Sequence, residues 1–133
     1  MPRLEIEAKT ENLEKVNDFI AEVLIGCPMK LLMQIDLAVE EIFVNIASYA
    51  YEGDDNTVDI SVVIDYAVRK IKVVFKDSGV RFDPLSKKDP DITLPARERK
   101  IGGLGIFMAK KLMDNISYEY VDNKNVLTIE KNY

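Results

Sequence analysis

Hydrophobic residues follow two different spacings along the chain, and the spacing predicts the elements. Apolar and polar residues alternate around residues 4–8, in a pair of stretches at 58–64 and 71–75, and in a final pair at 116–120 and 126–129. A period of two is typical of a strand with one covered face. The sequence therefore predicts a short first strand followed later by two hairpins.

Three other stretches carry apolar residues at helical spacing. The first runs from about residue 13 to 24, with Thr10 as its expected N-cap, and Gly26-Cys27-Pro28 ends it. The second, at about 29–51, lacks Gly and Pro and is apolar over much of its surface, which predicts a long, largely buried helix. The third follows a glycine cluster and continues to about Met113.

The periodicity is lost between residues 80 and 101, where three prolines occur among mixed charges. Loops this long in compact domains are usually functional lids or disordered. The predicted order is strand, helix, helix, strand, strand, lid, helix, strand, strand. This order predicts an α+β fold, a two-layer sandwich with a mixed, mostly antiparallel sheet and helices on one face.

Length and composition narrow the class of protein. The chain of 133 residues is expected to form a single domain, residues 1–133, because domains usually have about 100–200 residues. The net charge of -5 and the pI of about 4.8 argue against nucleic acid as a direct partner. No apolar run approaches the ~18–20 residues of a membrane span, and no signal peptide is expected. The lone Cys27 fits a reducing, cytoplasmic setting.

The chain has no histidine, which excludes a Ser-His or Cys-His triad and a histidine-ligated zinc site within it. The candidate chemistry lies elsewhere. Glu40 and Glu41 precede Asn45 in the long predicted helix, and Glu41 and Asn45 are four residues apart, so they share one helix face. One interpretation is a satisfied core amide beside two solvated glutamates. The other is an oxygen ligand for a hard cation, next to a carboxylate that positions a nucleophile.

A second motif, residues 77–84, reads Asp-Ser-Gly-Val-Arg-Phe-Asp-Pro and follows a predicted strand. Most Asp-x-Gly sequences after a strand are ordinary turns. In the functional interpretation, Asp77 is a hydrogen-bond acceptor at the rim of a pocket, and an exocyclic amine such as that of adenine is one partner it can fix.

The third motif is Gly102-Gly103-Leu104-Gly105, which opens the last predicted helix just after Arg99 and Lys100. A helix N-terminus presents unpaired N–H groups and a positive potential, and glycines let a phosphate chain come close. Basic residues on a lid can then close on the terminal phosphate. The alternative is a flexible hinge before a helix. Three clustered glycines in a glycine-poor chain favour anion binding.

Together the three motifs, in this order, resemble those of the GHKL ATPase superfamily, which includes gyrases and histidine kinases. The resemblance is carried by residues 38–45 with Ala50-Tyr51, by residues 77–84 and by residues 101–114. Within the superfamily, the chain length and the sequences of the motifs are similar to those of the anti-sigma factor serine kinases of sporulation and stress-response switches. The resemblance implies a GHKL-type sandwich with an ATP lid at about residues 80–101.

The resemblance also implies a role for each motif residue. Glu41 would be the general base that activates a serine or threonine hydroxyl of a partner protein, and Asn45 would hold the Mg²⁺ that bridges the phosphates of ATP. Asp77 would accept from the adenine amine, with Gly79 letting the ring lie close. The glycine box, Gly102, Gly103, Leu104 and Gly105, would provide backbone contacts to the phosphates.

Three departures from the family pattern stand out. Many relatives carry histidine four residues after the asparagine, where this chain has Tyr49. Relatives often place an arginine near the glycine box to meet the γ-phosphate, and here Arg99 and Lys100 are both candidates. A Gly-Thr before the last strand of many relatives is replaced by Lys124-Asn125, which leaves Asn125 as a candidate adenine contact.

The function implied by the resemblance is an ATP- and Mg²⁺-dependent serine/threonine protein kinase in the cytoplasm. Such kinases are regulatory switches, usually homodimers, that hold a sigma factor and phosphorylate a STAS-type anti-sigma antagonist. Two alternatives stay open. One is a nucleotide-sensing binding module without catalysis, prompted by Tyr49. The other is a detached ATP-binding domain of a histidine kinase, which would require a histidine on a separate partner.

Overall fold

The computed structural model describes residues 1–49, 57–86 and 103–133. Its strands and helices, in chain order, are β1 (Arg3–Glu7), α1 (Leu13–Val23), α2 (Met29–Tyr49), β2 (Thr57–Asp65), β3 (Lys70–Asp77), α3 (Gly103–Leu112), β4 (Asn115–Val121) and β5 (Lys124–Asn132). Two short 3-10 turns, η1 (Thr10–Asn12) and η2 (Pro84–Ser86), precede α1 and follow β3. The order of strands and helices is the one that the hydrophobic pattern predicts.

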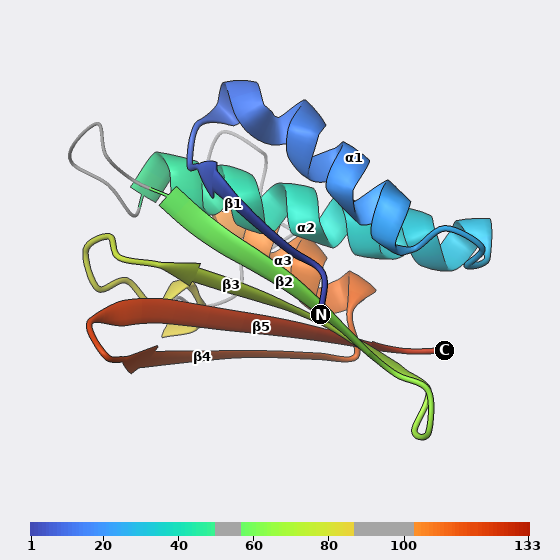
Figure 1. Cartoon of the computed structure of the whole chain (residues 1–133). Helices are drawn as coiled ribbons and strands as arrows, with labels where there is room; N and C mark the ends of the chain where they lie inside the picture. The colour runs from blue at the N-terminus through green and yellow to red at the C-terminus, as the bar shows by residue number, and fades with distance from the viewer. Residues whose placement is uncertain (50–56, 87–102) are drawn as a thin grey trace, which may run out of the picture.

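The strands form one five-stranded sheet in the order β1-β2-β3-β5-β4 (Figure 1). Each of the four described strand pairs is antiparallel, so the described sheet is not the predicted mixture of parallel and antiparallel pairs. The last strand lies between β3 and β4, because the chain crosses from β3 over α3 to the far edge before returning. This insertion makes the end of β3 a neighbour of the start of β5, and in the register Asp77 is opposite Asn125.

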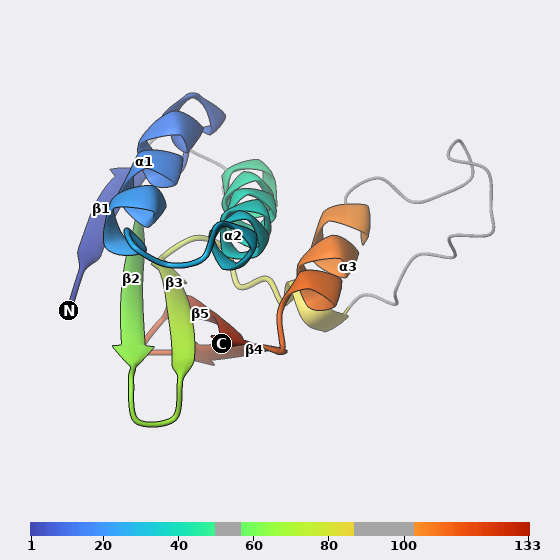
Figure 2. The same ribbon diagram turned by 90° about the vertical axis from the view of Figure 1, so that its right-hand side faces the viewer.

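The three helices cover one face of the sheet, with α2 between α1 and α3 (Figure 2). The predicted two-layer sandwich with its helices on one face is confirmed. The core lies between the two layers and contains the largest fully buried side chains. They come from α1 and the residue after it, from α2 and from each of the three central strands: Ile20, Leu24, Ile35, Ile42, Phe43, Ile60, Ile71, Phe75 and Ile129. Burial of this apolar surface holds α2 firmly against the sheet.

The start of α1 differs from its predicted position. The predicted N-cap Thr10 is wrong, because Thr10 begins the 3-10 turn and Asn12 occupies the N-cap position of α1. The long helix α2 is described to Tyr49, and residues 50 and 51 of the predicted helix lie outside the described residues. Gly26 takes a positive φ of +87° between α1 and α2, a conformation that favours glycine.

No helix within the described residues is long and apolar enough to cross a membrane. The hairpin predictions are confirmed, since β2 pairs with β3 and β4 pairs with β5. Asp122 and Asn123 of the β4–β5 turn both have positive φ values, 53° and 61°. This matches the tight turn preferred between antiparallel strands.

Candidate functional site

A small pocket lies where α2 meets the ends of the central strands. It is lined by Asn45 and Ile46 of α2, Asp77 of β3, Phe82 and Pro84 of the following loop, Tyr118 of β4, and Asn125 and Leu127 of β5. Two motifs more than thirty residues apart in the sequence therefore contribute polar groups to one cavity, through Asn45 and Asp77. Most of the other lining side chains are apolar or aromatic, which is the usual composition of a small-molecule site.

Asn45 is half-buried on α2, and no hydrogen bond of its side chain to another described residue is seen. A core amide would be expected to find partners, because burying an unpaired amide costs free energy. Within the described part of the chain, the interpretation of Asn45 as a satisfied core amide has no support. Asn45 lines the pocket, and no hydrogen bond with another described residue occupies its amide.

Asp77 is almost fully buried, with 4% of its surface exposed, at the last position of β3. Its Oδ1 accepts two hydrogen bonds, from the backbone N–H of Gly79 at 3.0 Å and from Nδ2 of Asn125 at 3.0 Å. Its Oδ2 accepts none from the described residues. Burial raises the pKa of Asp77, and the two donors partly oppose this. The Asp-x-Gly motif thus forms a turn and, at the same time, presents one carboxylate oxygen for another donor.

Glu41 lies one helical turn before Asn45 on α2 and is half-buried. The first turn of α3 packs against it so closely that a Cβ on Gly105 would lie 2.5 Å from Oε2 of Glu41. A side chain at position 105 would push the Glu41 carboxylate aside, so the absence of one lets this carboxylate lie against the first turn of α3. The neighbouring Glu40 is also half-buried, and together with burial it raises the pKa of Asp36.

The glycine box is described only in part. Gly103, Leu104 and Gly105 form the start of α3, as the sequence predicts, while Gly102, Arg99 and Lys100 lie outside the described residues. The predicted lid at about residues 80–101 is described as far as Ser86, and its first part contains the 3-10 turn η2. Gly79 is half-buried immediately after β3, where its N–H contacts Asp77.

Two pocket residues, Tyr118 and Phe82, are missing from the sequence prediction. The hydroxyl of Tyr118 donates to Oδ1 of Asn125 at 2.5 Å, and the backbone N–H of Phe82 donates to the same oxygen at 3.0 Å. A signal for this cluster exists in the sequence. Asn125 begins the alternation 125, 127, 129, whose other members face the core, and so it places a polar group at a core-facing position.

Residues 6–131 match the family model described as "Histidine kinase-like ATPase domain". The match covers nearly the whole chain, and the fold and the pocket-lining motifs are in keeping with it. The protein therefore belongs to the histidine kinase-like ATPase domain family, the GHKL class that its motifs resemble.

Two curated relatives are similar to this chain over most of its length. The chain is 27% identical over 108 residues to "Serine-protein kinase RsbW" of Listeria monocytogenes serotype 4a, covering 77% of this chain and 67% of that protein. It is 28% identical over 130 residues to the protein of the same name from Bacillus cereus, covering 93% of this chain and 80% of that one. These relatives are serine-protein kinases by name.

Solved structures show the same fold. The structure of the RsbU and RsbW domains of Rv1364c from Mycobacterium tuberculosis matches with a TM-score of 0.63 and 17% identity. The match covers 99% of this chain but only 32% of that longer chain. The catalytic domain of the histidine kinase ThkA matches with a TM-score of 0.58 and 17% identity, covering 99% of this chain and 96% of that one. At these identities the likeness concerns the fold.

Proposed function

We propose that this protein is an ATP-dependent serine/threonine protein kinase that acts as an anti-sigma regulatory factor. The observation that carries the proposal is the pocket in which Asn45 and Asp77 meet, one helical turn from Glu41. The family membership supports the use of ATP, and the names of the relatives from Listeria and Bacillus support serine as the acceptor.

The adenine end of the nucleotide is proposed to bind at Asp77. Its Oδ2 is the oxygen without a described hydrogen bond, and an exocyclic amine supplies the donor that this oxygen lacks. Gly79 presents no side chain beside it, so its backbone can approach the ring closely. The apolar and aromatic lining residues, Ile46, Phe82 and Leu127, provide surface for the faces of a purine.

The phosphate end is proposed to bind at the first turn of α3. The backbone N–H groups of Gly103, Leu104 and Gly105 belong to the start of this helix, where they have no partner within the helix. Such groups and the helix dipole attract phosphate oxygens. Arg99 or Lys100 is proposed to meet the γ-phosphate, and Gly102 to join the backbone contacts.

Mg²⁺ is proposed to accompany the nucleotide, with Asn45 as its protein ligand. No group of three or more His, Cys, Asp or Glu side chains that could hold a metal ion occurs among the described residues. This donor set fits a cation carried by a nucleotide, since Mg²⁺ usually takes one or two protein oxygens and completes its shell with phosphate and water oxygens. When bound, the ion supplies neutralisation of phosphate charge.

Glu41 is proposed as the general base. Its carboxylate lies beside the first turn of α3, at the place proposed for the phosphates, so it can accept the proton from a hydroxyl that is presented there by a partner protein. Phosphoryl transfer depends mostly on positioning and charge neutralisation, which Asn45, α3 and the lid are proposed to provide. The chain itself needs no histidine, because the acceptor hydroxyl belongs to the partner.

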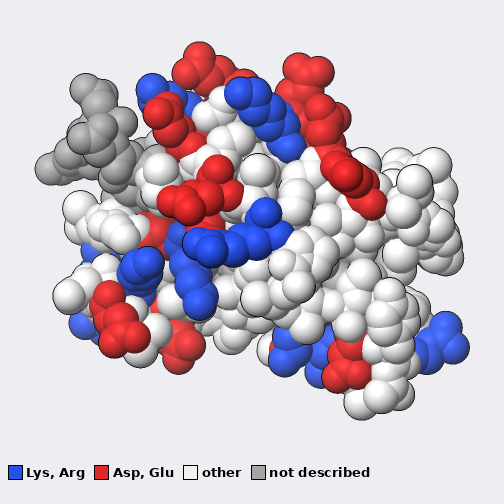
Figure 3. All heavy atoms as spheres, in the orientation of Figure 1, with Lys and Arg blue, Asp and Glu red and all other residues white. Residues whose placement is uncertain are grey.

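The proposed partners are proteins: a sigma factor that is held in the nucleotide-bound state, a STAS-type antagonist that receives the phosphate, and a second copy of this chain in a homodimer. The face seen in Figure 3 mixes acidic and basic side chains, with the acidic ones gathered towards α1, where Glu14, Asp18 and Glu22 are exposed. Together with the net charge of -5, this favours protein partners over nucleic acid in the cytoplasm.

The proposal is tested by measuring ATP binding and phosphate transfer in the same variants. Asn45→Ala is expected to lose Mg-ATP binding, as measured by calorimetry. Glu41→Gln is expected to bind Mg-ATP normally but to transfer labelled phosphate to a STAS-domain protein at least about a hundredfold more slowly, the usual contribution of a general base. Glu40→Gln, one position away on the same helix, is the matched control. It is expected to bind Mg-ATP and to transfer phosphate as the wild type does.

Equal Mg-ATP binding by the wild type and Asn45→Ala would contradict the site. Undiminished transfer by Glu41→Gln would contradict its role as base. Tight ATP binding by the wild type without labelling of any STAS-domain protein encoded near its gene would favour the nucleotide-sensing module over the kinase.

A further inference from the structure

Asn125 occupies an unusual position for a polar side chain. It begins the core-facing side of β5, is buried with 5% of its surface exposed, and lies directly opposite Asp77 in the strand register. A buried amide at such a position is costly unless every one of its hydrogen-bonding groups is used.

All of the hydrogen-bonding capacity of this amide is used. Its Nδ2 donates to Oδ1 of Asp77 at 3.0 Å and to the backbone carbonyl of Val80 at 3.0 Å, with the carbonyl of Gly79 at 3.5 Å. Its Oδ1 accepts from the backbone N–H of Phe82 and from the hydroxyl of Tyr118. An amide has two N–H donors and two acceptor lone pairs, so none remains for a nucleotide.

The partners also fix which way the amide points. The N–H of Phe82 can only donate, so it requires the oxygen, and the Val80 carbonyl can only accept, so it requires the nitrogen. A carboxylate at Asp77 likewise accepts only. Aspartate at this position would lack the donors, and leucine would lack both kinds of group. Asparagine therefore pairs with both the hydrogen-bond donors and the hydrogen-bond acceptors that surround position 125.

The hydrogen bond from Asn125 restricts the orientation of the Asp77 carboxylate. With Oδ1 held by Asn125 and by the N–H of Gly79, the carboxylate cannot rotate without breaking two hydrogen bonds, and Oδ2 is left in one place with acceptor capacity only. Such an acceptor matches the amine at the 6-position of adenine. A 6-oxo purine presents a carbonyl oxygen there, and its N1–H could be reached only if the carboxylate turned.

We propose that Asn125 is a positioning residue for base selection: together with Tyr118 it locks the Asp77 carboxylate so that the site accepts a 6-amino purine and rejects a 6-oxo purine. The proposal rests on the proposed nucleotide site and deepens it. It replaces the sequence-based prediction that Asn125 itself contacts adenine, because the structure assigns all four of its hydrogen bonds to the protein.

The experiment compares binding of ATP with binding of ITP, which differs from ATP in carrying a 6-oxo group in place of the amine. Calorimetry of the full chain with Mg²⁺ present gives both dissociation constants. In Asn125→Ala the carboxylate keeps only the hydrogen bond from the N–H of Gly79 and turns more easily. The preference for ATP over ITP is therefore expected to fall by about tenfold or more, the range for loss of a hydrogen bond to a charged group.

A milder variant guards against misfolding. Tyr118→Phe removes one donor to Asn125 and keeps the ring, and it is expected to reduce the ATP preference in the same direction by a few-fold. Tyr120→Phe on the same strand, whose ring lies against Arg81 at 5.0 Å, is the matched control, and so is Asn115→Ala at the start of β4. Both controls are expected to keep the wild-type preference.

The outcomes separate this proposal from the one it rests on. A wild type that binds neither triphosphate would overturn the nucleotide site itself. A wild type that binds ATP, with variants whose affinities for ATP and ITP fall by equal factors, would overturn the positioning role and leave Asn125 as a structural residue only. An unchanged ATP preference in both Asn125→Ala and Tyr118→Phe would overturn it as well.

Discussion

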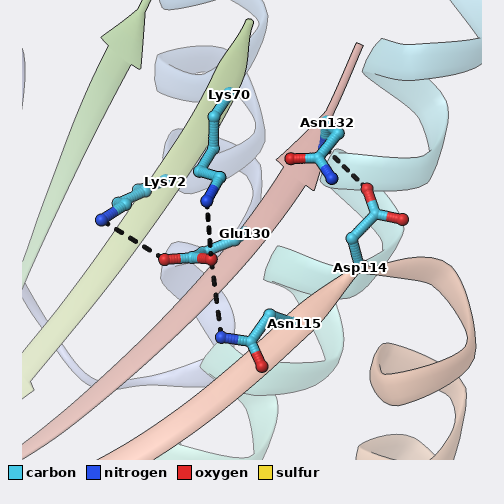
Figure 4. Close-up of polar contacts among 6 residues, drawn as sticks. All are labelled: Lys70, Lys72, Asp114, Asn115, Glu130 and Asn132. Atoms are coloured by element: carbon cyan, nitrogen blue, oxygen red, sulfur yellow. Dashed lines mark hydrogen bonds and ion pairs between the residues drawn. The ribbon is translucent and has the colours of Figure 1, made fainter. Parts of the chain in front are cut away.

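Two carboxylates of this protein, Asp77 and Glu130, each accept a hydrogen bond from an asparagine on a neighbouring strand. They lie on opposite faces of the sheet and have different neighbours. Asp77 faces the helices, and Asn125 donates to it. Glu130 points to the other side of the sheet, where Asn115 donates to it and the ammonium groups of Lys70 and Lys72 lie 3.5 and 3.3 Å away (Figure 4).

The surroundings shift the two pKa values in opposite directions. Burial raises the pKa of Asp77, and no ion pair with a described lysine or arginine offsets it. Burial alone would raise the pKa of Glu130 too, but Lys72, Lys70 and Asn115 together hold it below its usual value.

We interpret the difference as that between a structural carboxylate and one available to the proposed ligand. Glu130 has both oxygens occupied by neighbours on β3 and β4, and so it ties three strands together. Asp77 is held by one oxygen only, in a pocket, at a cost in desolvation that packing alone does not require. A buried carboxylate with a free oxygen is the arrangement expected of a binding residue.

The largest expected effect comes from Asp77→Asn. The amide keeps the size of the side chain but loses the negative charge, so ATP affinity is expected to fall by about a hundredfold, the upper range for a hydrogen bond to a charged group. Calorimetric titration with Mg-ATP measures it. Glu130→Gln is the matched change at the other carboxylate and is expected to leave ATP affinity unaltered. Equal affinities for wild type and Asp77→Asn would break the comparison.

The same variant sharpens the comparison through stability. The folded pKa of Asp77 lies above its unfolded value, near 3.8, so folding is favoured below that value and the advantage is lost as the pH rises through the folded pKa. Asp77→Asn escapes this loss. It is expected to be at least as stable as the wild type at pH 7, as measured by urea unfolding. A clearly less stable variant would show that the charge supports the fold.

Gly105→Ala tests the contact between α3 and Glu41, with an intermediate expected effect. The new Cβ would lie 2.5 Å from Oε2, so the Glu41 carboxylate must move. Stability is expected to hold or rise by up to about 1 kcal/mol, because alanine is the better helix former. Phosphate transfer is expected to fall by about tenfold to a hundredfold, since a misplacement of about 1 Å can cost up to about a hundredfold.

Gly26→Ala is the control for this change. Gly26 has a positive φ of +87° and no atom within 4 Å of an added Cβ. The substitution is expected to cost about 1 kcal/mol of stability through backbone strain and to leave transfer unchanged. Normal transfer by Gly105→Ala in the labelled-phosphate assay would separate Glu41 from the reaction.

The smallest expected effect is on Glu130. Because its folded pKa lies below the ordinary value of 4.5, its contribution to stability is present above that pH and is lost as the pH falls through the folded pKa. Glu130→Gln is expected to cost about 0.5 kcal/mol at pH 7, the scale of partly exposed ion pairs, and nothing near pH 2. Urea unfolding at both pH values measures it. A constant difference at both values would contradict the assignment.

The sequence predicts the fold well because strands and helices here differ clearly in hydrophobic period. The alternation at 58–64 and 71–75 and the helical spacing in α2 match β2, β3 and α2 of the structure. It predicts Asp77 as a pocket acceptor from the Asp-x-Gly motif. The error at Thr10 is of the usual kind, since a 3-10 turn commonly precedes an α-helix and the start of a helix is the part that sequence patterns locate least well.

The sequence predicts fewer of the hydrogen bonds and packing contacts within the pocket. Nothing local shows that Tyr118 and Phe82 both donate to one oxygen of Asn125, because this depends on the register that places β5 between β3 and β4. The closeness of Gly105 to Glu41 likewise depends on how α3 packs on α2. Contacts of this kind are set by tertiary structure, while the motifs only supply the residue types.

The most direct test of the nucleotide site is the thermal unfolding of the wild type with and without Mg-ATP. A ligand that binds only the folded state, at about a hundred times its dissociation constant, adds about 2.7 kcal/mol. For a domain of this size that corresponds to a rise of about 10 °C in the melting temperature. The wild type is expected to show such a rise, and Asp77→Asn, with its expected hundredfold weaker affinity, a rise of only about 1–2 °C at the same concentration. An equal rise in both proteins, or none in the wild type at millimolar Mg-ATP, would contradict it.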